Sequence, residues 1–349
     1  MAMPSWSLWL AGVLASLALV AVLVGAFASA CAPMDAEDDE AVFVDLRQGE
    51  GPSALAGRLA AERLIRSGLA FRLAARFSAS PQRWRAGHYR LKRSMDVPEM
   101  LAMLDAAQPI PRRLTVPEGT DLPGLVARLM REAGHDAATW GGLCRAPHRF
   151  AAGRPWLADL GADATLEGYL FPDTYDLPEQ TGRPEVLLGR MLDRFGQVAW
   201  PLLRLGGHGL TPREVLVLAS IVEREAVRAE ERPLIAGVFL GRLAVGMPLG
   251  SDPTVEYVLG FRQTVDRPLT RKDIAVDSPW NTYRVKGLPP GPICNPGVAS
   301  IRAVLAAGRT DLRYFVARGD GSHVFSRTHA EHRAAVRAVR SRRKAATAG

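Results

Sequence analysis

Cysteine is scarce in this 349-residue chain, which contains only Cys31, Cys144 and Cys294. Three cysteines exclude a disulfide-dense secreted scaffold and a zinc site with four cysteine ligands, and their spacing includes no CxxC pair. The seven histidines form no HExxH motif, so we expect no metal site. Whether Cys144 and Cys294 form a disulfide depends on their Cα atoms lying within about 7 Å of each other, which the sequence leaves open.

Motifs of several common chemistries are also absent. No GxxxxGK[ST] or GxGxxG segment occurs, so a phosphate-binding loop for a nucleotide has no support. No GxSxG segment marks a nucleophilic serine, and no basic-aromatic motif is typical of nucleic-acid binding. We therefore expect neither a cofactor nor a nucleic-acid partner.

Lysine is rare, with four residues, yet 44 Lys and Arg outnumber 36 Asp and Glu and give a net charge of +8. A basic balance favours an anionic partner, such as an acidic polymer or lipid headgroups. Hydrophobic residues make up 48% of the chain, which is enough to bury a core. The length fits two or three domains.

One long run without charge, residues 8–30, lies near the N-terminus. As a helix it would be roughly 34 Å long, which is enough to cross a bilayer. An acidic segment follows, and no Lys or Arg precedes Arg47. We expect a retained transmembrane anchor with the N-terminus inside and the bulk of the protein outside. Two alternatives stay open: a cleaved signal peptide, and a lipoprotein signal that ends at Cys31.

The remaining chain predicts an α+β protein in several parts. We place the anchor at residues 1–31, an acidic linker at 32–41, an N-terminal α+β region at 42–150 and a catalytic domain at 151–345. The N-terminal region contains two units of strand, turn and helix, which begin at Val42 and at Leu114. Such units resemble small LysM-like modules, although a coincidental strand–helix pair would look the same.

Glu223 is the best candidate for chemistry. Thr211 and Pro212 predict a helix start, and Glu214 completes a capping box. The next two turns are almost wholly apolar, so this helix should be buried. A carboxyl group at the end of such a helix loses water, which raises its pKa and suits a general acid. The alternative is a simple ion pair between Glu223 and a nearby arginine.

Six ordered segments between residues 164 and 332 resemble the endolytic murein transglycosylase family (MltG/YceG-like). They are Leu166–Tyr175, Leu218–Glu225, Glu231–Leu243, Met247–Tyr257, Ser278–Gly297 and Tyr314–His332. The departures from the family pattern are Cys294, where the family more often has alanine, and a loosely matching N-terminal region.

The resemblance implies an enzyme that cleaves the MurNAc–GlcNAc bond of peptidoglycan and leaves 1,6-anhydro-MurNAc ends. The catalytic glutamate of the family corresponds to Glu223, which would act first as acid and then as base. Further residues in the matched segments are predicted to bind substrate: Glu167, Asp173, Thr254, Asn281 and Tyr283. Glu167 is the expected second carboxylate.

The resemblance also implies a single-pass protein of the bacterial inner membrane, with its catalytic domain in the periplasm beside peptidoglycan synthases. Two other functions stay open. A muramidase-type hydrolase would use water and a second working carboxylate. A non-catalytic peptidoglycan-binding scaffold would need no catalytic group.

Overall fold

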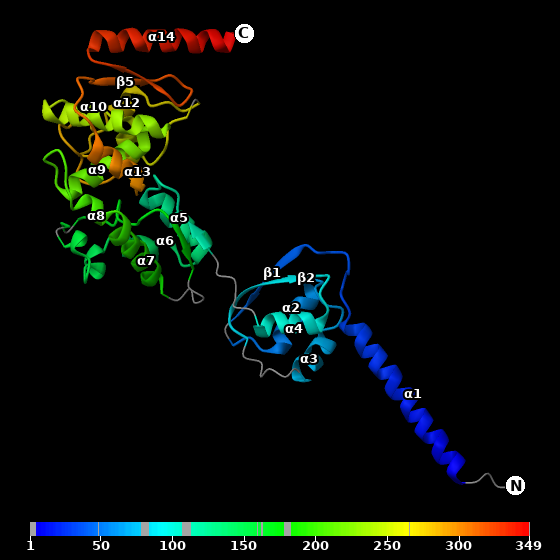
Figure 1. Ribbon diagram of the computed structural model, residues 1–349. Helices are drawn as coiled ribbons and strands as arrows, with labels where there is room; N and C mark the ends of the chain where they lie inside the picture. Colours follow the sequence, from blue (N-terminus) through cyan, green and yellow to red (C-terminus); the bar gives the residue numbers. More distant parts are fainter. Residues whose placement is uncertain are drawn as a thin grey trace. The chain divides into compact units, whose positions relative to one another are not determined.

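The computed structural model describes residues 5–47, 49–77, 84–106, 113–158, 160–161, 163–177, 183–264 and 266–348. The chain forms two compact units, residues 1–112 and residues 113–349, which we call the N-terminal and C-terminal units. The fold is mixed α and β, as predicted. Figure 1 shows its helices and strands.

The N-terminal unit begins with α1 (Ser5–Cys31). Within the described residues, Trp9–Cys31 is the one helical segment long and apolar enough to cross a membrane. Its large apolar side chains from Trp9 to Phe27 are exposed, which is consistent with a single-pass membrane protein.

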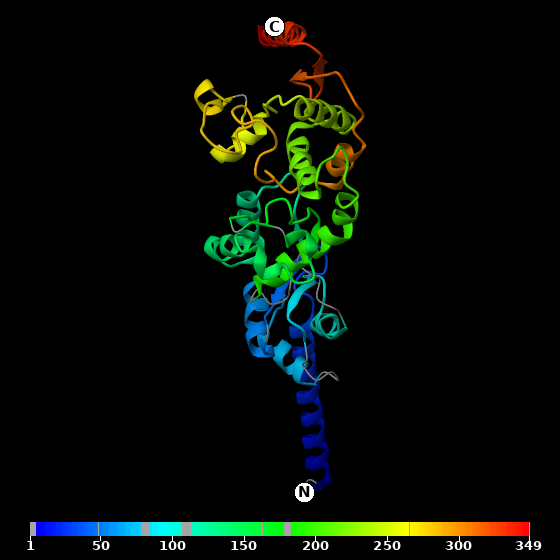
Figure 2. The same cartoon turned by 90° about the vertical axis from the view of Figure 1, so that its left-hand side faces the viewer.

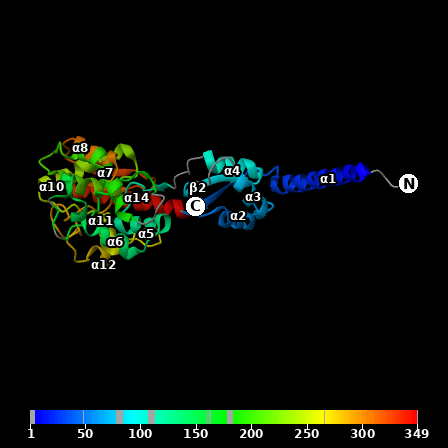
Figure 3. The same cartoon turned by 90° about the horizontal axis from the view of Figure 1, so that it is seen from below.

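After α1, the chain forms a strand, two helices and a second strand that pairs antiparallel with the first, followed by one more helix. The elements are β1 (Ala41–Leu46), α2 (Pro52–Ala61), α3 (Gly68–Phe77), β2 (Gly87–Lys92) and α4 (Val97–Ala106). The β1–β2 ladder pairs Ala41 with Lys92 and Leu46 with Gly87. The helices pack with each other and against the strand pair (Figures 1 and 3). The strand and helix predicted from Val42 are present as β1 and α2, whereas the LysM-like identity stays a prediction.

The C-terminal unit is mainly helical. Its first elements are β3 (Arg113–Thr115), α5 (Leu122–Ala133), α6 (Ala137–Cys144), the 3-10 turns Pro147–Phe150 and Pro155–Leu157, β4 (Thr174–Asp176), α7 (Pro184–Val198) and α8 (Trp200–Leu203). Next come α9 (Pro212–Glu225), the 3-10 turn Ala229–Glu231, α10 (Arg232–Ala244), α11 (Asp252–Leu259), α12 (Arg271–Ile274) and α13 (Val298–Ala306). The chain then forms β5 (Tyr314–Ala317), β6 (His323–Ser326) and α14 (His329–Ala348).

Helix α9 lies at the centre of this unit. Every residue from Val215 to Val222 is buried, and α9 packs against α8, α10, α11 and α13 (Figure 1). In Figure 2 the yellow segment that contains α11 and α12 stands to one side of the green helices of this unit. Two strand pairs border the helices: β3 with β4 and β5 with β6, both antiparallel.

The structure divides the chain after residue 112 rather than after residue 150. The physical reason is the pairing of β3 with β4, in which Leu114 lies opposite Tyr175. Residues 113–150 also contribute Leu125, Trp140 and Phe150 to the large core of the C-terminal unit. The strand and helix that begin at Leu114 therefore belong to this unit. All three cysteines are buried and free, so Cys144 and Cys294 form no disulfide.

Candidate active site

Glu223 lies in the last turn of the buried helix α9. The predicted capping box is present at the start of this helix: the Thr211 hydroxyl accepts a hydrogen bond from the Glu214 backbone, and the Glu214 carboxylate accepts one from Thr211 N–H. The buried apolar residues that follow the cap hold the C-terminal turn of the helix, which contains Glu223, in a fixed position. The Glu223 side chain is only 6% exposed, which agrees with the predicted burial.

Three further segments meet at the Glu223 carboxylate. The backbone N–H of Gly297, just before α13, donates a hydrogen bond to Oε2 at 3.0 Å. The guanidinium of Arg232, at the start of α10, lies 3.4 Å from Oε1. A Cβ placed on Gly119 would lie 3.5 Å from the Cγ of Glu223, and Gly119 has a positive φ of 74°. The β3–α5 loop therefore passes directly over Glu223.

A second carboxyl group, that of Glu118, lies in this loop and was missed in the sequence. Its oxygens pack against Gly297 so closely that a Cβ there would overlap them. Burial raises the pKa of Glu118, the charge of Glu223 raises it further, and Arg232 acts in the opposite direction. The Pro117-Glu118-Gly119 segment was visible as a turn before a helix, but nothing in its spacing linked it to Glu223.

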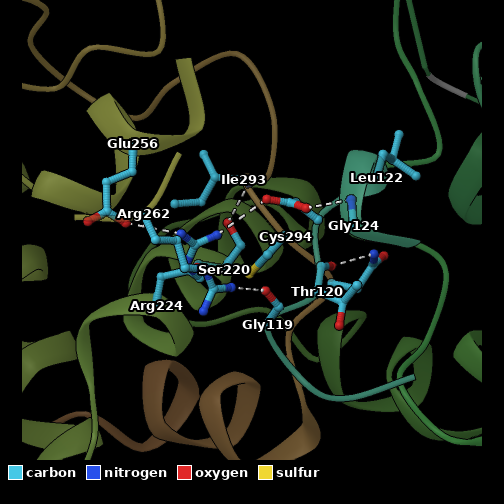
Figure 4. Close-up of polar contacts among 12 residues, drawn as sticks. Gly119, Thr120, Leu122, Gly124, Ser220, Arg224, Glu256, Arg262, Ile293 and Cys294 are labelled. Atoms are coloured by element: carbon cyan, nitrogen blue, oxygen red, sulfur yellow. Dashed lines mark hydrogen bonds and ion pairs between the residues drawn. The ribbon is translucent and has the colours of Figure 1, made fainter. Parts of the chain in front are cut away.

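Arginine side chains hold the loop in place (Figure 4). Arg224 is 4% exposed and forms ion pairs with Glu256 at 3.1 Å and with Asp121 at 3.6 Å. Arg262 donates a hydrogen bond to the Gly119 carbonyl at 2.9 Å (Figure 4). These contacts connect the β3–α5 loop to the end of α9 and to α11.

The side chain of Glu167, which precedes β4 in the chain, is buried against the start of α5. Its Oε2 accepts a hydrogen bond from Leu122 N–H at 2.9 Å. The pKa of Glu167 is raised to about 8, chiefly by burial and in smaller part by the charge of Asp121, while the hydrogen bond from Leu122 N–H opposes this shift. Glu167 therefore helps Asp121 to cap α5. Its predicted role as a second catalytic carboxylate stays a prediction.

Two of the predicted substrate-binding residues hold the protein's own loops. Thr254 is fully buried; its hydroxyl donates to the Ser251 carbonyl at 2.6 Å and lies 2.9 Å from the Thr282 hydroxyl. Asn281 is also fully buried. Its side-chain N–H groups donate to the carbonyls of Ile274 and Val276, and its side-chain oxygen accepts from Tyr283 N–H.

The other two predicted residues are more exposed. The Tyr283 hydroxyl donates to Asp252 at 2.7 Å, and this tyrosine is 39% exposed. The carboxylate of Asp173 pairs with Arg194 at 2.6 Å. Partial burial raises the pKa of Asp173, but the hydrogen bond from the Thr174 backbone, together with the hydrogen bond and the charge of Arg194, outweighs burial and lowers the pKa below its ordinary value. Tyr283 thus offers a partly accessible aromatic face, whereas Asp173 is tied to α7.

Glu225, two residues after Glu223, is a further buried carboxyl group. The Ser251 hydroxyl donates to its Oε1 at 2.6 Å. The pKa of Glu225 is raised to about 7, chiefly by burial and in smaller part by the charges of Asp252 and Glu256, while the hydrogen bond from Ser251 acts in the opposite direction. Across the described part of the chain, no three His, Cys, Asp or Glu side chains gather in a way that could hold a metal ion.

The model of the YceG-like family matches residues 44–338. The chain belongs to the YceG-like family. The match includes α9, the β3–α5 loop and the segment that contains Gly297, so every residue around Glu223 lies within the family region.

Two curated relatives are named endolytic murein transglycosylase. One, from Bacillus subtilis, is 30% identical over 311 residues, which cover 86% of this chain and 85% of the relative. The other, from Streptococcus pneumoniae, is 31% identical and covers 82% of this chain and 56% of the relative. A crystal structure of a YceG-like protein from Listeria monocytogenes has a TM-score of 0.57 and 28% identity, with coverage of 84% of this chain and 98% of that chain.

The predicted family is therefore confirmed. The names of the relatives agree with the expected enzyme class, a lytic transglycosylase that acts on peptidoglycan. The apolar helix α1 is consistent with a single-pass membrane protein of this family.

Proposed function

We propose that this YceG-like chain is an endolytic lytic transglycosylase of peptidoglycan. It would cleave the β-1,4 bond between MurNAc and GlcNAc in nascent glycan strands and leave 1,6-anhydro-MurNAc ends. The observation that carries the proposal is the position of Glu223, on which α9, α10, α13 and the β3–α5 loop converge. The names of the relatives support the choice of substrate.

Glu223 would provide the acid and base steps. Its carboxyl group protonates the glycosidic oxygen as the bond to C1 breaks. The muramyl C6 hydroxyl then attacks C1 of the same sugar and gives up its proton to the Glu223 carboxylate. The attacking hydroxyl is part of the substrate. Its effective concentration at C1 is therefore high, and it can react in place of a water molecule. When Glu223 has released its proton, Gly297 N–H and Arg232 stabilise the charge that remains.

The five predicted substrate-binding residues would contribute in different ways. The exposed face of Tyr283 suits a sugar ring. Thr254 and Asn281 would act by fixing the loops around it, since both are buried and hydrogen bonded to the protein. Glu167 and Asp173 would hold α5 and the segment before β4.

The protein would work at the inner membrane of a bacterium, with α1 as its anchor and its catalytic unit in the periplasm. An excess of basic residues would suit a polymer whose stem peptides carry carboxylates. Peptidoglycan synthases, which make the nascent strands, are the expected protein partners.

A muramidase-type hydrolase is the second candidate, and Glu118 is the observation that favours it. A hydrolase needs one carboxyl group as acid and another to activate water or to act as nucleophile. Glu118 and Glu223 both border Gly297. The two reactions differ in their products, because only hydrolysis adds an oxygen atom from water.

Products formed in ¹⁸O water therefore test the proposal. The full-length chain in detergent is incubated with uncrosslinked glycan strands, and the new ends are analysed by mass spectrometry. We expect 1,6-anhydro ends without ¹⁸O. Reducing ends that carry ¹⁸O would instead show a hydrolase, and intact strands with a folded protein would favour a non-catalytic scaffold.

A further inference from the structure

The loop that carries Glu118 is joined to the segment that carries Gly297. Gly119 N–H donates to the Asn295 carbonyl at 2.9 Å, and Asn295 N–H donates to the Thr120 carbonyl at 2.9 Å. The Asn295 side chain adds a hydrogen bond to Thr120 and accepts one from the backbone of Leu170. Asn295 is fully buried, so this junction holds the position of Glu118 relative to Gly297.

The same segment contacts the other carboxyl group. Gly297 N–H binds the Glu223 carboxylate, while the Cα of Gly297 lies against the Glu118 carboxylate. Glu118 and Glu223 are thus placed on two sides of one glycine. Any side chain at Gly297 would separate them or displace Glu118.

We propose that Glu118 is a second catalytic carboxyl group, which accepts the proton of the muramyl C6 hydroxyl while Glu223 protonates the glycosidic oxygen. This inference rests on the proposed transglycosylase function. It divides between two groups the two proton transfers that a single glutamate would otherwise have to perform at two different oxygen atoms.

The step is balanced. The C1–O4 bond breaks, its electron pair stays on O4, and O4 receives the proton of Glu223. A new bond forms between O6 and C1, and the O6 proton moves to Glu118. Return of this proton from Glu118 to Glu223 restores the starting state. Glu118 is only partly buried and remains open to solvent, so water can carry the proton without being consumed.

The electrostatics suit a base at Glu118. Burial and the neighbouring Glu223 raise its pKa, which makes the Glu118 carboxylate a stronger proton acceptor. Arg232 is the cation that opposes this shift. The other two arginines near the loop have partners of their own: Arg224 pairs with Glu256, and Arg262 donates to the Gly119 carbonyl. Among the described residues, none donates a hydrogen bond to the Glu118 carboxylate.

The test is the pH profile of kcat on uncrosslinked glycan strands for the full-length wild type and Glu118→Gln. A base must be ionised, so wild-type activity should fall as the pH drops through the pKa of Glu118. In Glu118→Gln we expect kcat to fall about 100-fold at neutral pH and the residual activity to lose this acidic limb. Loss of the acidic limb separates a proton acceptor from a residue with only a structural role.

Glu185→Gln is the matched control, because Glu185, on α7, forms an ion pair with Arg149 and both side chains are exposed. It should leave kcat and the pH profile unchanged. Circular dichroism verifies that both variants are folded.

A Glu118→Gln variant with kcat within threefold of the wild type, or with an unchanged acidic limb, would overturn the inference. The proposed function would still stand in that case if the wild type forms anhydro ends and Glu223→Gln does not. If the wild type instead forms ¹⁸O-labelled ends, both proposals fail.

Discussion

At the residue scale, the chemistry depends on a few groups whose surroundings differ. Glu223 faces a backbone N–H and an arginine. Glu118 lies at the surface beside the same glycine. Glu167 is buried against the first N–H of α5. Three glutamates in one unit therefore have three environments, and environment determines which of them can hold or accept a proton at neutral pH.

The burial of Glu167 predicts a dependence of stability on pH. Its pKa is about 8 in the folded protein and 4.5 ordinarily, so the folded state retains a proton that the unfolded chain releases. The contribution to stability is fully present below about pH 4.5 and is lost as the pH rises toward 8. We expect the melting temperature of the wild type to fall relative to that of Glu167→Gln over this range.

The measurement is thermal unfolding of both proteins at several pH values. Glu225 titrates in the same direction, but it is present in both proteins and cancels in their difference. A difference in melting temperature that stays constant from pH 5 to pH 8 would contradict the assignment.

Sequence reasoning could find Glu223 but not Glu118. The cap at Thr211 and the apolar turns that follow are local patterns, and the resemblance to a family supplied the role of Glu223. Glu118 becomes a candidate only in the folded chain, where hydrogen bonds between distant segments place Asn295 and Gly297 beside its loop. Periodicity describes neighbours along the chain, so it carries no information about such contacts. The buried roles of Thr254 and Asn281 escaped prediction for the same reason.

At the element scale, α9 is the support of the site. Its N-terminus is closed by the capping box, and its apolar body is packed between α8, α10, α11 and α13. The residues that stabilise the start of this helix are therefore different from Glu223, the residue at its end to which we assign the chemistry.

Removal of the cap should show this separation. Thr211→Ala loses the side-chain oxygen that accepts from the Glu214 backbone, which costs about 1 kcal/mol and lowers the melting temperature by about 2–4 °C. We expect kcat to stay unchanged, because the far end of α9 is held by packing. Thr211→Ser keeps the hydroxyl group and serves as the control. An equal loss of stability in both variants would show that the cap contributes nothing.

At the scale of the whole molecule, two compact units follow one another along the chain, and the first begins with a helix that is long and apolar enough to cross a membrane. The sequence predicted the apolar helix and the strands that begin at Val42 and Leu114, because hydrophobic length and alternation are local. It placed a domain boundary near residue 150, because the Gly- and Pro-containing stretch near residue 153 resembles a linker. In the structure, the ring of Trp156, just after this stretch, packs at a tilt against the rings of Phe195 and Trp200, and β3 pairs with β4.

The proposed orientation makes a prediction for the whole chain. Protease added to spheroplasts that contain the protein should digest the C-terminal unit, whereas in inside-out membrane vesicles this unit should be protected. The reason is that α1 would hold both units on the outer side of the membrane. The N-terminal residues should show the opposite pattern when they are marked with a tag. Protection of the C-terminal unit in spheroplasts would reverse the proposed topology.

The most direct test of the central claim is the rate at which anhydro-muramyl ends form with the wild type and with Glu223→Gln, in full-length protein on the same uncrosslinked strands. Glutamine keeps the size of the side chain but can neither donate nor accept the proton. We predict at least a 100-fold loss of rate without loss of strand binding or of melting temperature. A Glu223→Gln variant that cleaves at the wild-type rate would contradict the account.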